Sequence, residues 1–375
     1  MNFTKLRPVF LLSAITIIST LFIWLVFYFN LPQILGFPKT SLETVFANYD
    51  GPNYLAITKC GYDKACIAKS FSLPSPLEYY PAHLPGYPAL IKILSIFTST
   101  PKAMLLATLL GSIFLTIVSF YFFKTYLESK SAFWLSLLFI FFPARFFILR
   151  LVGAPETWFI GFILLSLLLN QRKQYLGSAL AGCLALFFKS PGILLFGVYG
   201  LKFLFELFKN KKILFNYSYY LLVPLTGLFI FYIYYLQTGD FWAYFHSGDN
   251  IHLMALPYLV FVSNHTWINT IWLEEIIYIY VFCFSAIYLY YQKHKIDVVW
   301  LFLIVFTLAG VFVAHRDISR YLSPAYPLIL LAFSRFVNTK PAKIIFWLIL
   351  PAIILYSINF IIGNVAPVAD WAPYL

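Results

Sequence analysis

The feature that most constrains this chain is a succession of long apolar segments joined by short polar connections. The first runs from Val9 to Phe29, close to the ~20 residues that a helix needs to cross a bilayer. Similar segments follow at about 103–123, 131–149, 156–170, 175–188, 191–208, 214–236, 270–291, 296–314, 321–337 and 344–362. We therefore predict an all-α, polytopic integral membrane protein with about 11 transmembrane helices.

The charge content excludes a soluble globular protein. Charged residues make up only 11% of the chain, against about 25% in soluble domains. The net charge is +12, but the basic residues form short clusters between apolar segments, as in cytoplasmic loops under the positive-inside rule. No nucleic-acid partner is needed to explain them. The sequence has no Walker, dinucleotide-binding or metalloprotease motif, so ATP- or NAD-driven chemistry has no support.

The same clusters predict the topology. No small-residue cleavage site follows the first segment, so we expect a retained helix with its N-terminus inside. Residues 84–97 are short and contain Pro85, Pro88 and Lys92, which favours an interfacial or re-entrant segment. The connections that then face the cytoplasm carry these basic residues: Lys124, Lys130, Arg172, Lys173, Lys209, Lys211, Lys212, Lys293, Lys295, Arg335, Lys340 and Lys343. We expect one transmembrane domain over 1–375, with 30–102 as its first outer loop.

That outer loop contains the first candidate catalytic residue, Asp50, with Tyr49 and Tyr54 beside it. Asp is a good helix N-cap, so one interpretation is a capping or solvated acid. The other is a general base, because sugar transfer to a hydroxyl needs a carboxylate within reach of the acceptor proton. The topology places the remaining polar clusters on the same side of the membrane as Asp50.

Two of these clusters supply Glu156 and Lys189. Glu156 opens an apolar segment, where the helix dipole alone favours an acid; it could instead orient acceptor or donor hydroxyls. Lys189 precedes Ser190, Pro191 and Gly192. It could extend toward the interface as lysines do, or it could bind phosphate at the entry to a helix.

Further candidates are cationic. Arg316 and Arg320 flank Asp317 on a short outer connection, where a salt-bridge cluster or bidentate phosphate recognition would explain them. His246 lies in an aromatic run after Thr238-Gly239-Asp240, so it belongs either to an interfacial belt or to the sugar or phosphate site. Arg145 and Arg150 are charged residues near membrane depth, and such residues are expected to be functional. The sequence assigns no role to either.

The four cysteines fall into two groups. Cys183 and Cys283 lie in apolar segments, as small core residues do. Cys60 and Cys66 share a polar loop, so a disulfide can form if that loop faces an oxidising compartment. No Cys/His spacing suggests zinc, and no Asp-x-Asp motif or histidine cluster suggests another metal. We expect no cofactor.

Taken in order, the polar clusters resemble the motifs of GT-C polytopic glycosyltransferases, and in particular the PIG-V family of GPI mannosyltransferases and its bacterial relatives. An aromatic-Asp-Gly loop is matched by Tyr49-Asp50-Gly51, Tyr54 and Gly61-Tyr62, and an aromatic-Pro element by Tyr79-Tyr80-Pro81 and Gly86-Tyr87-Pro88, with an insertion between them. The later elements are matched by Ala154-Pro155-Glu156, Lys189-Ser190-Pro191-Gly192, Thr238-Gly239-Asp240-Phe241, Arg320-Tyr321-Leu322 and Tyr326-Pro327. Lys189 replaces the family's Arg, and Phe241 replaces its Pro.

The resemblance implies transfer of a hexose, with mannose favoured, from a polyprenyl- or dolichyl-phosphate sugar to a lipid-linked or glycan acceptor. It also implies a single displacement that inverts the configuration of the sugar. Asp50 would take the acceptor proton, and Arg320, Lys189 and His246 would neutralise the lipid phosphate. Arg316, Tyr54 and Tyr321 complete the expected substrate contacts. The site would face the outside of a bacterial plasma membrane or the lumen of the endoplasmic reticulum. The alternatives are a lipid-linked-sugar transporter or flippase, a GT-C enzyme that transfers another sugar or modifies protein, and a membrane scaffold.

Overall fold

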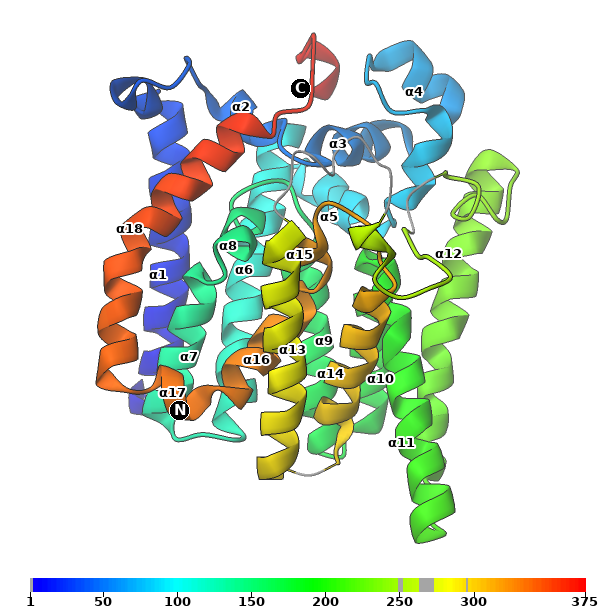
Figure 1. Ribbon diagram of the computed structural model, residues 1–375. Coiled ribbons are helices and arrows are strands. Elements are labelled where there is room, and N and C mark those ends of the chain that lie inside the picture. Colours follow the sequence, from blue (N-terminus) through cyan, green and yellow to red (C-terminus); the bar gives the residue numbers. More distant parts are fainter. Residues whose placement is uncertain (1–2, 249–251, 263–272, 295) are drawn as a thin grey trace.

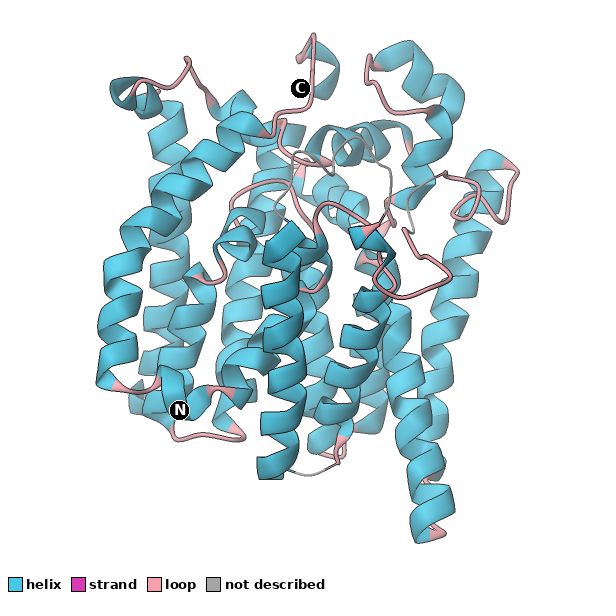
Figure 2. Cartoon of the chain, in the orientation of Figure 1, coloured by secondary structure: helices cyan, strands magenta, loops and turns pink. Residues whose placement is uncertain are grey.

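The computed structural model describes residues 3–248, 252–262, 273–294 and 296–375, and these form a bundle of helices (Figures 1 and 2). Lys295 of the predicted basic clusters lies outside the described residues. Within them, β pairing is limited to two isolated bridges, Asn48 with Val365 and Leu253 with Val313. The all-α prediction is therefore confirmed.

Six described helical segments are long and apolar enough to cross a membrane: Arg7–Tyr28, Thr100–Lys124, Ser190–Asn210, Phe215–Thr238, Leu273–His294 and Lys340–Gly363. They contain α1 (Phe3–Tyr28), α6 (Thr100–Lys124), α11 (Leu194–Asn210), α12 (Leu222–Thr238), α13 (Leu273–His294) and α18 (Lys340–Gly363). Shorter apolar helices are α7 (Ser129–Phe141), α9 (Glu156–Gln171), α10 (Tyr175–Phe188), α14 (Val298–Val311) and α16 (Tyr326–Ala332). Fourteen residues of helix, as in α14, extend ~21 Å against a hydrocarbon core of ~30 Å. The count of 11 therefore stays a prediction.

Short helices gather at the end of the bundle opposite the N-terminus (Figure 1). The connection from α1 to α6 forms α2 (Leu42–Phe46), α3 (Gly51–Cys60), α4 (Lys64–Ser70) and α5 (Gly86–Leu94) there, and the C-terminus lies beside them. The nine residues of α5 extend only ~13 Å, too short to cross a bilayer. The remaining short helices are α8 (Ala144–Leu149), α15 (Ile318–Tyr321) and α17 (Ser334–Val337).

The basic connections lie at the other end, the end that carries the N-terminus. The turns from α6 to α7 and from α9 to α10 are found there, together with the last residues of α13, the first residues of α14 and α17 (Figure 1). Lys124 ends α6, Arg172 follows α9, and Arg335 is in α17. This is the segregation of charge that the topology requires. The membrane side that each end occupies stays a prediction.

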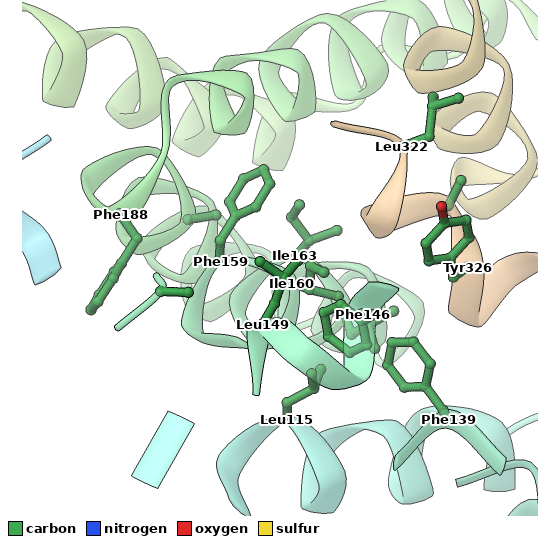
Figure 3. Close-up of a cluster of buried hydrophobic side chains, with 14 of the residues drawn as sticks. Leu115, Phe139, Phe146, Leu149, Phe159, Ile160, Ile163, Phe188, Leu322 and Tyr326 are labelled. Carbon is green, nitrogen blue, oxygen red and sulfur yellow. The ribbon is translucent and has the colours of Figure 1, made fainter. Parts of the chain in front are cut away.

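The core between the two ends is dominated by aromatic and branched side chains (Figure 3). Phe139 and Phe146 stack with ring centroids 4.9 Å apart, joining α7 to α8. Arg150, just after α8, is fully buried and donates to Ser112 O at 3.0 Å and to Thr116 Oγ1 at 2.6 Å. A guanidinium satisfied by acceptors of α6 fastens α8 to the bundle, and we assign Arg150 this structural role.

Candidate active site

A cavity of about 430 Å³ brings together most of the polar clusters that the sequence singled out. Its walls include residues from the loop before α3, from the start of α9, from the end of α10 and from α15. The predicted site residues that line it are Asp50, Tyr54, Glu156, Lys189, Arg316, Arg320 and Tyr321. Residues up to 271 positions apart thus share one chamber, which the order of motifs could suggest but could not establish.

Arg320 is the centre of the charge network in this cavity. Its Nη2 lies 3.1 Å from Asp50 Oδ2, and its Nε lies 2.6 Å from Glu156 Oε1. Lys189 Nζ lies 2.7 Å from the same Glu156 oxygen. Glu156 is only 1% exposed, so its charge depends on these two cations. The other carboxylate oxygen, Oε2, is buried without a hydrogen-bond partner among the described residues, which leaves it able to accept a bond from a ligand.

Local structure explains how Asp50 reaches the cavity. Asp50 occupies the N-cap position of α3, but its side chain makes no capping hydrogen bond to that helix. The capping interpretation therefore does not describe this carboxylate, which is directed to Arg320. Gly51 is required beside it, because a Cβ there would lie 2.4 Å from the Phe46 carbonyl oxygen.

The turn that carries Lys189 has a comparable requirement. Lys189 ends α10 in extended conformation, and the chain turns directly into a 3₁₀ helix at Ser190–Ile193. A Cβ on Gly192 would lie 2.4 Å from the Leu186 nitrogen, so only glycine allows this close return onto α10. The Ser-Pro-Gly sequence thus fixes where the ammonium group enters the cavity.

The electrostatics of the site keep Asp50 ionised. Burial raises the pKa of Asp50, but Arg320 and His83 lower it by more, so the pKa lies well below its ordinary range. Burial lowers the pKa of Lys189, with Glu156 opposing the effect. Arg320 and Lys189 are thus two neighbouring cations, which form ion pairs with the carboxylates of Asp50 and Glu156. The two cations can bind an anion if that anion replaces part of their ion pairs with the carboxylates.

Sequence reasoning missed two histidines that line the cavity, His83 and His252. His83 lies in the insertion between the two aromatic-Pro motifs, with Nε2 at 3.7 Å from Asp50 Oδ1. His252 is placed by the backbone, since its carbonyl accepts from Ala314 N at 2.9 Å, and its ring lies 4.3 Å from that of His315. Burial, followed by the neighbouring His252 and Arg320 charges, lowers the pKa of His315 to about 3, so this ring is neutral at physiological pH.

One predicted site residue lies elsewhere. The structure places His246 outside the residues that line the cavity, with a side chain 64% exposed. Its Nδ1 lies 2.6 Å from Asp240 Oδ2, so the Thr-Gly-Asp motif and the histidine form a local pair after α12. The sequence placed His246 near the phosphate because the motif order suggested it, and the helix end directs it to the surface instead.

Arg145, to which the sequence assigned no role, contacts two of the residues that line the cavity, Asp317 and Tyr49. Its Nε lies 3.3 Å from Asp317 Oδ1, and its Nη1 donates to the Tyr49 hydroxyl at 3.4 Å. The Tyr49 ring in turn lies under the Arg320 guanidinium, 4.6 Å from the ring centroid. Asp317 is buried three residues before Arg320. Pairing with Arg145 keeps this acid from competing with Asp50 and Glu156 for Arg320.

We predict that Arg145→Met lowers both stability and turnover, because it leaves Asp317 buried without its cation. Breaking such a pair costs about 3 kcal/mol of unfolding free energy. The double variant Arg145→Met/Asp317→Asn should recover most of that loss, since no uncompensated charge remains. Thermal unfolding in detergent and the initial rate of transfer measure the two effects. A double variant as unstable as the sum of its single variants would contradict the pairing.

The loop that carries Asp50 is also held by the end of α18. Ala366 N donates to Ala47 O at 2.8 Å, and Asn48 Nδ2 donates to Ile361 O at 2.8 Å. Asn48 is completely buried. Residues 363–366 form one wall of the cavity, so the C-terminal segment both positions the Asp50 loop and limits the space in front of it.

Outside the cavity, Cys60 and Cys66 form a disulfide that joins the end of α3 to α4. Cys283 is buried and Cys183 partly buried, in helices as expected. Among the described residues, no group of three or more His, Cys, Asp or Glu side chains is arranged to hold a metal ion.

A second cavity, of about 510 Å³, adjoins the polar one. Its lining is mainly apolar and comes chiefly from α12 and α14, with further contributions from Leu84, the ends of α10 and α11, the 3₁₀ turn at 190–193, Tyr244, Phe245 and Leu253. Ser190, Pro191 and Tyr321 belong to the walls of both cavities. A polar chamber lined by Lys189, Arg316 and Arg320 therefore borders an apolar groove between membrane helices.

Solved structures with a similar fold are known. ArnT from Cupriavidus metallidurans, in a crystal structure bound to undecaprenyl phosphate, matches 89% of this chain and 62% of its own at 12% identity, with a TM-score of 0.53. The oligosaccharyltransferase of Archaeoglobus fulgidus, in its apo form, matches 96% of this chain and 57% of its own at 13% identity, with a TM-score of 0.54. This chain thus spans less than two thirds of either protein. No protein-family model matches the sequence, and no curated protein matches it by sequence.

At these identities the likeness establishes the fold. The all-α membrane-protein fold class predicted from the sequence is confirmed, and both solved structures share the fold of this chain. The narrower PIG-V assignment rests on the motifs alone.

Proposed function

We propose that this protein is a membrane glycosyltransferase that moves a hexose from a polyprenyl- or dolichyl-phosphate sugar to a hydroxyl of a lipid-linked glycan. Mannose is the hexose that we favour. One observation carries the proposal. A carboxylate, Asp50, and two partly buried cations, Arg320 and Lys189, line one cavity that borders an apolar groove. A donor with a phosphate head and an isoprenoid tail has that combination of chemistry.

Each group has a defined part in the reaction. Asp50 accepts the proton of the acceptor hydroxyl as its oxygen bonds to the anomeric carbon of the sugar. The bond from that carbon to the phosphate oxygen breaks, and the lipid phosphate leaves with its electrons. Arg320 and Lys189 neutralise the leaving phosphate. Because attack and departure occur on opposite faces of the sugar, the configuration inverts.

Glu156 serves this arrangement through its two carboxylate oxygens. Oε1 accepts from both Arg320 and Lys189, which holds the cations side by side. Oε2 has no protein partner among the described residues and is available to a sugar hydroxyl. Tyr54 and Tyr321 line the same cavity and offer ring surface to the sugar or lipid. Arg316, at the exposed rim, is a further contact for phosphate.

The bound undecaprenyl phosphate of the ArnT structure supports a polyprenyl-phosphate donor, since this chain shares that fold. The motif resemblance supports mannose and a glycolipid acceptor. The charge distribution supports a multi-pass location in which the cavity faces the outside of the cell or the lumen of the endoplasmic reticulum.

The test is transfer by purified protein in lipid nanodiscs. Polyprenyl-phosphate mannose, glucose and arabinose are offered in turn with a glycolipid extract, and mass spectrometry follows free polyprenyl phosphate and glycosylated product. We expect product with one hexose donor and none with the Asp50→Asn protein. If no donor is consumed and lipid-linked sugar instead equilibrates across proteoliposomes, the protein is a flippase and the proposal fails.

The apolar groove leads to a separate prediction about the lipid chain of the donor. Gly227, on α12, lines it and has only a Leu186 methyl, at 3.7 Å, near its missing Cβ. Gly227→Leu should fill part of the groove and raise the KM for a long-chain donor about tenfold, while a donor with a two-isoprene chain is much less affected. Gly197→Leu on α11, where a Cβ would meet nothing within 4 Å, is the matched control and should change neither value. Equal effects of both variants would place the lipid elsewhere.

A further inference from the structure

We propose that His83 is a positioning residue of the active site, which holds the Asp50 carboxylate in place from the side opposite Arg320. This inference rests on the proposed function, because it concerns the base which that function requires. No motif predicts His83. The argument comes from its packing, its distance to Asp50 and the state of its two ring nitrogens.

The His83 ring is fixed between two tyrosines. It follows the 3₁₀ helix Leu77–Ala82 and is 5% exposed. The Tyr54 and Tyr79 rings meet it edge-on at centroid distances of 5.0 Å and 5.1 Å. Its backbone is tied as well, since the His83 carbonyl accepts from the Tyr62 hydroxyl at 2.7 Å. A buried ring that packs against two tyrosines and is tied by its backbone can direct one nitrogen accurately.

That nitrogen is Nε2, which faces Asp50 Oδ1 at 3.7 Å. The other ring nitrogen, Nδ1, is buried without a hydrogen-bond partner among the described residues. A buried N–H without an acceptor is costlier than a buried lone pair without a donor. We therefore assign the ring proton to Nε2 and the lone pair to Nδ1, so that Nε2–H points at the carboxylate.

Asp50 then has a donor on each side. Arg320 Nη2 approaches Oδ2 at 3.1 Å, and His83 Nε2 approaches Oδ1. The 3.7 Å separation is longer than a hydrogen bond, as is common in catalytic sites that tighten when substrate binds. A donor phosphate competes for Arg320, and His83 is the partner that stays with the carboxylate. During transfer the acceptor proton goes to Asp50, and His83 keeps its own.

Other charged and titratable groups face Asp50 and stay in place in any His83 variant. They come from the loop before α3, from α3, the 3₁₀ helix Leu77–Ala82, α9, the end of α10, the segment at 252, the segment before α15 and α15: Tyr49, Tyr54, Tyr79, Glu156, Lys189, His252, His315, Arg316, Asp317, Arg320 and Tyr321. A change in the pH dependence of transfer on replacing His83 alone therefore reports the interaction between His83 and Asp50.

The experiment compares His83→Phe with His83→Gln. Phe keeps a ring between the two tyrosines but has no donor, whereas Gln restores an N–H at about the position of Nε2. For H83F we expect kcat to fall 10- to 100-fold, the donor KM to change less than threefold, and the acidic limb of the kcat/KM profile to move to higher pH. H83Q should recover most of kcat and return the limb toward its wild-type position. His294→Phe, an exposed histidine at the opposite end of the bundle, controls for the substitution itself.

Several outcomes would overturn the inference. Wild-type kcat with an unmoved acidic limb in H83F excludes it, and so does a loss of kcat that H83Q fails to rescue and that leaves the limb in place, since that result indicates packing alone. If H83F does not fold, His83→Met replaces it as the donor-free match to H83Q. An active H83F beside an inactive Asp50→Asn refutes the role of His83 and leaves the proposed function standing. A wild-type protein without transfer activity refutes the function itself.

Discussion

Asp50→Asn should lower kcat for sugar transfer by about 10²–10⁴-fold, the usual contribution of a general base. Asn has nearly the same shape and still accepts a hydrogen bond from Arg320 through its side-chain oxygen, but it cannot take the acceptor proton. The donor KM should change only a fewfold, because the cations and the apolar groove remain. Initial rates with saturating donor measure the first effect, and donor titrations the second.

Asp63→Asn is the matched control for this variant. Asp63 lies in the same connection between α1 and α6, is exposed, and caps α4 by accepting from Ala65 N and Cys66 N. Asn caps helices about as well, so activity and thermal stability should stay at wild-type values. Undiminished turnover in Asp50→Asn, or an equal loss in both variants, would end the assignment of Asp50 as the base.

The low pKa of Asp50 sets the sign of the pH dependence. Its carboxylate is already ionised at neutral pH, so the rate should not rise further with pH through the neutral range on account of this group. Because its pKa lies well below the ordinary carboxyl value of about 4, activity should persist through pH 4 and decline only in more acidic solution. A titrating limb near pH 6 in the wild-type protein would point to a different group as the base.

Arg320→Lys should have the other large effect, a fall in kcat of at least about 10²-fold, comparable to the loss of one preorganised donor at a developing charge. Arg320 uses two sides of its guanidinium, Nε for Glu156 and Nη2 for Asp50. A lysine ammonium is a single point of charge and cannot span both. Transfer rates and the KM of the donor should both deteriorate, because the same group positions the base and neutralises the phosphate.

The unfolding temperature of Arg320→Lys shows whether its activity is lost through a local change in the site or through unfolding of the protein. Lys keeps a positive charge near Glu156, so the unfolding temperature should fall only slightly, whereas Arg320→Met leaves Glu156 with Lys189 alone and should cost about 3 kcal/mol. Arg335→Lys, at an exposed position of α17 at the opposite end, is the matched substitution and should leave the rate unchanged. Full activity of Arg320→Lys would mean that the cavity is not where the phosphate binds.

The sequence by itself determined the all-α fold class of this protein and selected most of the charged residues that the cavity brings together. Apolar segments predict membrane helices because the bilayer acts on each segment separately, and basic connections follow from the cost of moving charge across it. Asp50, Glu156, Lys189 and Arg320 could be selected for a related reason, since polar groups beside such segments are costly unless they have partners.

Only the tertiary structure decided which partners those are. Arg320 meets Asp50 across 270 positions, and Val365 pairs with Asn48 next to the Asp50 loop, because helix packing brings distant ends to one face. His83 and His252 carry no pattern in the sequence, and the exposed position of His246 depends on where α12 ends. Contacts of this kind are set by the relative placement of whole helices, which no local periodicity records.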